Sequence, residues 1–142
     1  MAQKLLVTNT VVLQRFNMLQ LATGSTPTVT PVVINIQVPV EAIFVLFHNN
    51  NTALPVNRAR FILYNVENID YYAWERDDLS SLNYGLVEDS FFTEFRYFKY
   101  NTASANHYYS WYIKPNDYIE KINLVFNRGA SQFTYEVFIK RI

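Results

Sequence analysis

The sequence contains no cysteine, only three glycines and two histidines, and its twelve basic residues balance its twelve acidic ones. Without cysteine the chain has no disulfide framework, no thiolate metal ligand and no catalytic thiol. Gly24, Gly85 and Gly129 are too few and too scattered to build a loop that cradles phosphate, and no serine lies in a G-x-S-x-G motif. These absences argue against the common nucleotide enzymes and against hydrolases with a nucleophile elbow.

Neither charge sign is gathered into a run, so the chain lacks the basic stripe with which proteins bind nucleic acid. Long hydrophobic runs are also missing. Residues 42–47 are far short of the roughly 20 apolar residues of a membrane helix. At the start, only residues 5–7 are continuously apolar, whereas a signal peptide has about 7–15 such residues. We therefore expect a protein made in a cytoplasm without a signal peptide, with neither nucleic acid nor membrane as a partner.

What the chain does have is apolar and aromatic side chains. Half of its 142 residues are hydrophobic and 17% are aromatic. A chain of this length buries roughly two thirds of its unfolded surface when it folds. The composition therefore predicts a single domain, residues 1–142, whose stability comes from packing.

Alternation at period two dominates after residue 28 and predicts β-strands. Residues 32–38 alternate between Pro31 and Pro39, while residues 42–47, AIFVLF, are apolar on both faces, as in a central strand. Further strands are expected at 59–66, 69–75, 91–100, 106–114, 118–127 and 133–142. In the last of these, Phe138 alone breaks the alternation.

Three segments are less regular. Residues 11–22 fit a helix through Val12, Phe16 and Leu19, but they alternate nearly as well, and we favour a strand. Residues 24–30 are expected to form a loop or an extended edge. Residues 76–90 are expected to form a long loop with at most one helical turn, capped by Asp78.

Eight or nine short strands joined by turns, with little helix, predict an all-β protein. The expected architecture is an antiparallel β-sandwich of jelly-roll or Ig-like topology, and a closed barrel is the alternative.

The two histidines, His48 and His107, have no further ligand at a metal-binding interval, so no metal site is expected. Structural roles in a loop or at a sheet edge fit them better.

Carboxylates flank the long loop at Glu75, Asp77, Asp78, Glu88 and Asp89. A paired-carboxylate glycosidase site or a calcium site is conceivable there. Neighbouring Arg76 instead favours a solvated ion-pair cluster. We therefore expect no enzyme, no catalytic residue, no cofactor and no metal.

Residues 91–100, FFTEFRYFKY, place six aromatic rings on the two faces of one strand. The segments AIFVLF and YYSWYIK are similarly two-sided. Such rings fit the core, a subunit contact, or a platform that stacks on sugar. The candidates for a subunit contact or for ligand stacking are Phe92, Phe98, Tyr100, Tyr72, Trp74, Tyr109 and Trp111. Three two-sided strands in one small domain favour a homo-oligomer.

In composition, asparagine-rich loops and strand spacing, the chain resembles bacteriophage virion structural proteins, namely the jelly-roll and sandwich subunits of capsids, head fibres and tails. The resemblance implies a non-enzymatic auxiliary or decorating capsid subunit, located in the virion and in contact with its own copies and with other virion proteins. The alternative is a carbohydrate-binding, receptor-recognition β-sandwich that holds a glycan on Trp74 or Trp111. A small glycan-cleaving enzyme using Glu75, Asp77 or Glu88 is a third hypothesis.

Overall fold

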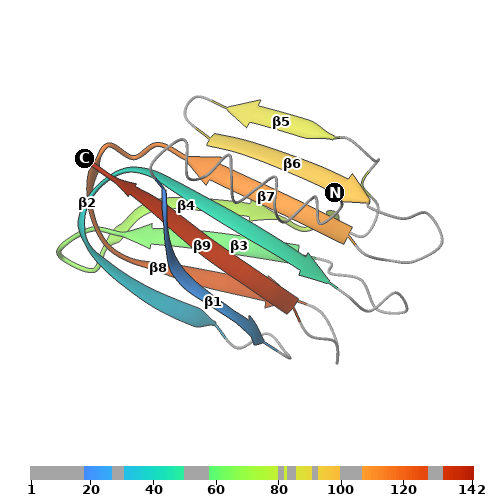
Figure 1. The fold of residues 1–142 in the computed structure, drawn as a ribbon, viewed down its shortest axis with the longest axis horizontal. Helices are drawn as coiled ribbons and strands as arrows, with labels where there is room; N and C mark the ends of the chain where they lie inside the picture. The colour runs from blue at the N-terminus through green and yellow to red at the C-terminus, as the bar shows by residue number, and fades with distance from the viewer. Residues whose placement is uncertain are drawn as a thin grey trace.

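A computed structural model of the chain consists of β-strands, with no α-helix in the part of the chain that it describes (Figure 1). That part is residues 18–26, 31–49, 58–79, 82, 86–90, 93–99, 107–127 and 133–142. The strands are β1 (Leu19–Thr26), β2 (Val32–Asn49), β3 (Arg58–Tyr64), β4 (Asp70–Arg76), β5 (Val87–Ser90), β6 (Thr93–Lys99), β7 (His107–Ile113), β8 (Asp117–Asn127) and β9 (Phe133–Arg141). The predicted all-β class is confirmed.

Strands β3, β4 and β6 to β9 lie where the alternation predicts them. Strand β1 includes the end of the segment 11–22, whose residues 11–17 lie outside the described part. The expected helical turn after Asp78 falls largely outside it as well. The prediction that 76–90 is a long loop with at most one helical turn is wrong over 87–90, because these residues form β5 by pairing with β6.

The prediction that a strand ends at Pro39 is also wrong, because β2 runs through it. Pro39 lies opposite Tyr118 of β8, next to a β-bulge between Asn35 and Val38. A bulge is one of the few places where a strand accepts a residue without an N–H donor. Within the bulge, Gln37 has a positive φ of 56°, which bends the strand locally.

The bend lets β2 serve two halves of one curled, antiparallel sheet. Its first half, from Val32 to Val40, pairs with β8, and its second half, up to Asn49, lies between β7 and β9. The hydrogen-bonded order is β4-β3-β8-β2-β7-β6-β5, while β9 pairs with both β2 and β1. In Figure 1 the sheet curls so that β3 and β8 lie on the far side of β9.

The main core fills the inside of this curl with rings from both halves. Phe61 of β3 lies 5.1 Å from Trp111 of β7 and 5.3 Å from Phe47 of β2, measured between ring centroids. Phe126 of β8 lies 5.3 Å from Phe47. Such pairs add about 0.5–1.5 kcal/mol each to the free energy gained by burial alone. The two halves of the sheet are thus held together by one aromatic core.

The two end strands of the hydrogen-bonded path, β4 and β5, are consecutive in the sequence. Near them the two ends of the sheet meet through side chains. The Thr93 hydroxyl of β6 donates a hydrogen bond to the Tyr72 hydroxyl of β4 at 3.2 Å, and the Trp74 and Phe95 rings are 5.1 Å apart. The curl is therefore drawn together by β4 and β6.

Candidate functional site

The second half of β2 is apolar on both faces, as its sequence predicts. Ile43, Val45 and Phe47 point into the main core. The alternate residues Ala42, Phe44 and Leu46 belong to a second, separate apolar cluster. Successive side chains of a strand point to opposite faces, so this second cluster lies on the outer side of the sheet. We call its members on β2, β7 and β9 the aromatic outer face: Ala42, Phe44, Leu46, Tyr112 and Phe138.

The register of the strands places three of these rings side by side. Phe44 of β2 lies opposite Phe138 of β9 on one side and opposite Tyr112 of β7 on the other. The Phe44 and Tyr112 rings meet edge to face at 6.2 Å, and the Phe44 and Phe138 rings are 6.4 Å apart. Cross-strand aromatic pairs of this kind stabilise a sheet. They also form a continuous aromatic row across three strands.

The burial of the aromatic outer face is uneven. Ala42 and Phe138 are buried, and Met18, just before β1, is buried with them. Phe44, Leu46 and Tyr112 are only half-buried. The pKa of the Tyr112 hydroxyl is raised, first by burial and then by the Glu41 and Glu94 carboxylates. An apolar centre thus remains partly open to solvent.

Charged side chains stand at both margins of this centre. On β6, Arg96 binds Glu94 with Nε–Oε1 and Nη2–Oε2 distances of 2.9 and 3.3 Å. On β9, the Glu136 carboxylate accepts a hydrogen bond from Gln20 Nε2 at 3.0 Å. An apolar centre with a polar margin is the usual anatomy of a protein interface.

The two carboxyl groups are in different electrostatic states. The hydrogen bond from Arg96 lowers the pKa of Glu94, and this effect outweighs burial. Burial raises the pKa of Glu136, and the hydrogen bond from Gln20 offsets only part of that increase. Glu136 is therefore the carboxylate that gains more from a new cationic neighbour.

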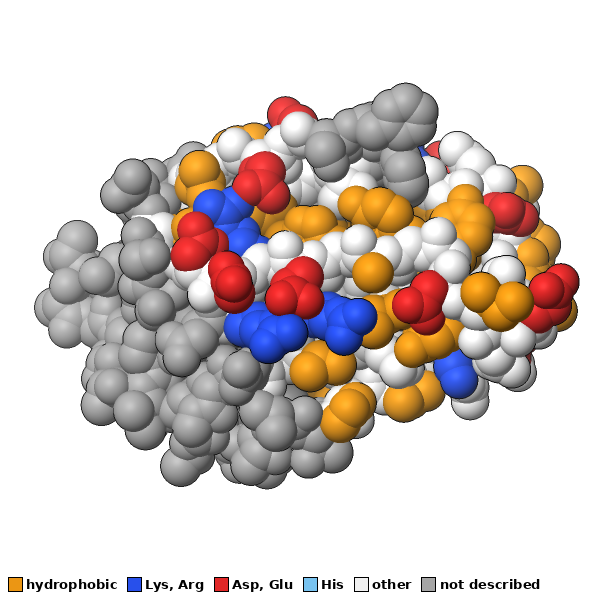
Figure 2. All heavy atoms as spheres, turned by 180° about the vertical axis from the view of Figure 1, so that it is seen from behind, with side chains coloured by type: hydrophobic (Ala, Val, Ile, Leu, Met, Phe, Trp, Pro, Cys, Tyr) orange, Lys and Arg blue, Asp and Glu red, His pale blue; other side chains and the backbone are white. Residues whose placement is uncertain are grey.

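The opposite outer surface, carried by β4, β3, β8 and the first half of β2, has a different character. Arg58 and Arg60 both bind the Glu75 carboxylate, at 3.1 and 3.5 Å. Lys121 Nζ lies 4.8 Å above the centre of the Tyr64 ring. Seen from behind (Figure 2), acidic, basic and apolar side chains alternate over short distances. We call the outward residues of these strands the mixed outer face: Val33, Arg58, Arg60, Ile62, Tyr64, Glu75, Lys121 and Asn123.

Three of the predicted contact residues are core residues. Trp111 and Tyr109 have no exposed surface, and Trp74 is 8% exposed. Trp74 stacks on Phe61 at 5.3 Å, and Tyr109 stacks on Phe47 at 4.9 Å. Burial raises the pKa of the Tyr109 hydroxyl. Rings enclosed by the chain's own side chains offer no face to a sugar or to a second subunit.

The other predicted contact residues are less completely described. Tyr72 is half-buried and packs against the main core. Phe92 and Tyr100 lie outside the described residues. Phe98 lies opposite Tyr108 of β7 in the strand register, and its side chain lies outside the described part.

Sequence reasoning did not select Phe44 or Phe138. The signals were present, since AIFVLF is apolar on both faces and Phe138 is the residue that breaks the alternation of β9. The pairing of residues 44 and 138, nearly a hundred positions apart, becomes visible only in the register.

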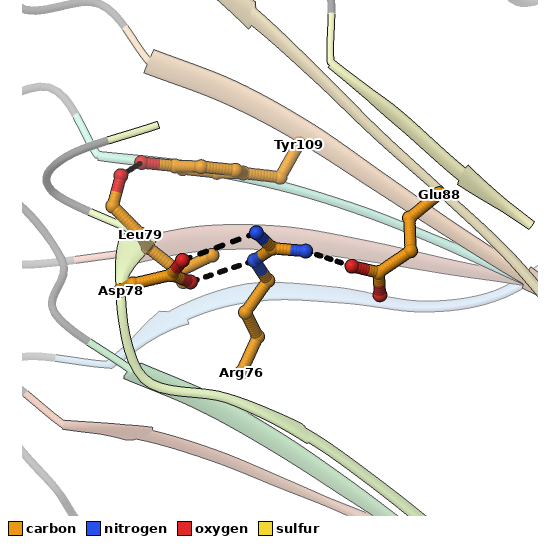
Figure 3. A network of polar contacts seen from close by, with 5 residues as sticks. All are labelled: Arg76, Asp78, Leu79, Glu88 and Tyr109. Atoms are coloured by element: carbon orange, nitrogen blue, oxygen red, sulfur yellow. Dashed lines mark hydrogen bonds and ion pairs between the residues drawn. The ribbon is translucent and has the colours of Figure 1, made fainter. Parts of the chain in front are cut away.

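Three of the five carboxylates that flank the long loop, Glu75, Asp78 and Glu88, form ion pairs. Arg76 binds Asp78 at 2.6 Å and also binds Glu88, as Figure 3 shows, and its guanidinium lies 5.6 Å from the centre of the Phe95 ring. Burial alone lowers the pKa of Arg76, but the two carboxylates outweigh it and raise the pKa. The predicted ion-pair cluster around Arg76 is confirmed.

The same network fixes the start of the long loop. Leu79 has no exposed surface, and the Tyr109 hydroxyl donates a 3.5 Å hydrogen bond to its carbonyl oxygen. Among the described residues, no three metal-ligating side chains gather into one site.

Comparison with protein-family models, with curated proteins and with solved structures finds no match for this chain. In the part of the chain that the structure describes, no helix has the length and apolar character needed to cross a membrane.

Proposed function

We propose that this chain is a non-enzymatic structural subunit that self-associates through its aromatic outer face. The observation that carries the proposal is the aromatic row of Phe138, Phe44 and Tyr112, which lies outside the main core and in which Phe44 and Tyr112 are only half-buried. Partly exposed aromatic rings between charged margins favour association with another surface. A second copy of the chain is the simplest source of such a surface.

The assembly we propose is a virion, in which the chain acts as an auxiliary or decorating subunit of a phage capsid or a related part. This choice is supported by the resemblance in composition, asparagine-rich loops and strand spacing. The proposed architecture is an antiparallel β-sandwich of jelly-roll or Ig-like topology. Its support is the contact of Phe61 with Trp111, which joins the two halves of the curled sheet.

A carbohydrate-binding role has less support. It depends on Trp74 or Trp111 as a stacking platform, and both rings are buried in the main core. The glycosidase hypothesis also has less support, because Glu75 and Glu88 are both bound by arginines.

The test is the solution mass of the full chain, measured by light scattering over a wide range of concentrations. We expect a discrete oligomer that persists on dilution. Phe44→Glu should weaken association at least about a hundredfold, because it places a charge in the apolar centre of the contact. Val33→Glu is the matched control, since Val33 is 54% exposed on the mixed outer face.

Circular dichroism must show that both variants remain folded. A wild-type chain that is monomeric at every concentration overturns the proposal. An oligomer that Phe44→Glu leaves intact shows that another surface is used.

A further inference from the structure

The row of side chains next to the aromatic row carries opposite charges at its two ends. In the strand register Leu46 of β2 lies opposite Glu136 of β9 and Ser110 of β7, and Ser110 lies opposite Arg96 of β6. The order across the sheet is therefore Glu136, Leu46, Ser110, Arg96. Neighbouring strands are about 4.8 Å apart, so the two charges are separated by roughly 14 Å.

All four side chains lie on the outer side of the sheet, where Arg96 is exposed, Leu46 and Glu136 are half-buried and Ser110 is buried. Their neighbours Val45, Tyr109 and Val137 belong to the main core, and so does Phe95 beside Arg96. Because side chains alternate along a strand, the four residues between these positions lie on the opposite side of the sheet. The row therefore belongs to the surface that self-association is proposed to use.

The midpoint of this row falls between β2 and β7. A twofold axis that runs parallel to the strands above this midpoint exchanges the two ends of the row. It places Glu136 of one copy over Arg96 of the other, and does so twice. In the aromatic row, the same axis places Phe44 over Tyr112 of the other copy.

We propose that the partner of the aromatic outer face is a second copy of the chain, related by this twofold axis and held in register by two reciprocal Glu136–Arg96 ion pairs. The inference rests on the proposed self-association and adds its geometry. Sheets commonly pack face to face with their strands nearly aligned, as this axis requires.

The chemistry of the two residues suits this role. Arg96 uses two nitrogens to bind Glu94, and a guanidinium has five N–H donors in all, so it can bind a second carboxylate. Glu136 has a neutral hydrogen-bond donor, Gln20, beside it, and burial disfavours its charge. An arginine from the second copy would satisfy that charge.

The same axis brings Phe138 over Glu94 of the other copy. That carboxylate is already bound by Arg96 within its own chain. The contact pairs a phenyl ring with a compensated ion pair.

A charge-exchange experiment tests the inference in the full chain. We expect Arg96→Glu and Glu136→Arg to weaken dimerisation by at least about tenfold each, which corresponds to roughly 1.4 kcal/mol. Each single variant places two like charges opposite each other at both ends of the contact. The double variant Arg96→Glu/Glu136→Arg restores opposite charges and should recover most of the lost affinity.

Arg60→Glu is the matched control, because it reverses the charge of an ion-paired arginine on the mixed outer face. Thermal unfolding of every variant separates a folding defect from a loss of association. If the wild type dimerises and Phe44→Glu dissociates it, but the double variant recovers nothing, the twofold arrangement is wrong and the proposed function stands. If the wild type is a monomer, both proposals fail.

Discussion

The two outer faces of the sheet differ in whether their side chains find all their partners within the chain. On the mixed outer face, Glu75 is bound by Arg58 and Arg60, and Lys121 lies over the Tyr64 ring. The charged groups there have partners within the chain and can stay in water at little cost.

On the aromatic outer face, the rings have each other as partners, but Phe44 and Tyr112 are still partly exposed. A strand in which polar and apolar residues alternate has one polar face, and that face needs no covering in water. A strand that is apolar on both faces needs a second covering, which is why the two faces should respond differently to the same kind of change.

The largest expected difference concerns the removal of an apolar side chain. Phe138→Ala should lower the free energy of unfolding by about 3 kcal/mol, because Phe138 is 9% exposed and its ring packs on Phe44. Val33→Ala on the mixed outer face should change it by less than about 0.5 kcal/mol, since Val33 is 54% exposed. Denaturant titration measures both. Equal losses would show that the two faces contribute alike to stability.

A smaller effect is expected from the ion pairs of the mixed outer face. Glu75→Gln removes the partner of Arg58 and Arg60, whose side chains are about two fifths exposed, as is that of Glu75. The loss should be under about 1 kcal/mol and should shrink as salt is added. Thermal unfolding at low and high salt measures it, with Glu67→Gln, an exposed turn residue, as the control. A large, salt-independent loss would mean that this face is packed rather than solvated.

The smallest effect is a pH dependence with opposite signs at the two margins of the aromatic outer face. Burial raises the native pKa of Glu136, so its ionised form destabilises the monomer once the pH exceeds the usual carboxyl range. Glu136→Gln should therefore stabilise the monomer at neutral pH, and the gain should vanish in acid.

Glu94 should behave in the opposite way, because its hydrogen bond to Arg96 lowers its native pKa. Its contribution to stability is present above the usual carboxyl pKa and is lost as the pH falls through the native value. Glu94→Gln should be less stable than the wild type at neutral pH, with the gap closing in acid. Unfolding of dilute protein across this pH range tests both variants, and shifts of the same sign would contradict the assignment.

How much of the fold and of the candidate site could be predicted from the sequence depends on how far apart in the sequence the interacting residues lie. AIFVLF was predicted as a central, two-sided strand from its own residues, and it lies between β7 and β9. Trp74 and Trp111 were predicted as contact candidates, but which face of a strand meets the core depends on the register with distant strands, and that register buries them. Phe138 stood out as a break in the alternation, and it belongs to the second cluster.

Two errors concern the bounds of strands. A proline usually ends a strand, but the neighbouring bulge at Gln37 lets β2 continue through Pro39. The four residues of β5 carry no alternating pattern, since Glu88 and Asp89 are both charged. They are extended because they pair with β6. A pairing partner outside the segment cannot be recognised from the residues of the segment itself.

Strand β2 pairs with strands in both halves of the sheet, and this affects how the chain folds during its synthesis. Its second half pairs with β9, so Phe44 cannot pack on Phe138 until β9 has been synthesised. Its first half pairs with β8. Pairings this distant in sequence are slow to form. On the ribosome, β2 emerges well before β7, β8 and β9, and it stays without these neighbours until they have been synthesised. Until then its apolar residues are exposed and prone to aggregate, and the rate of translation sets how long that exposure lasts.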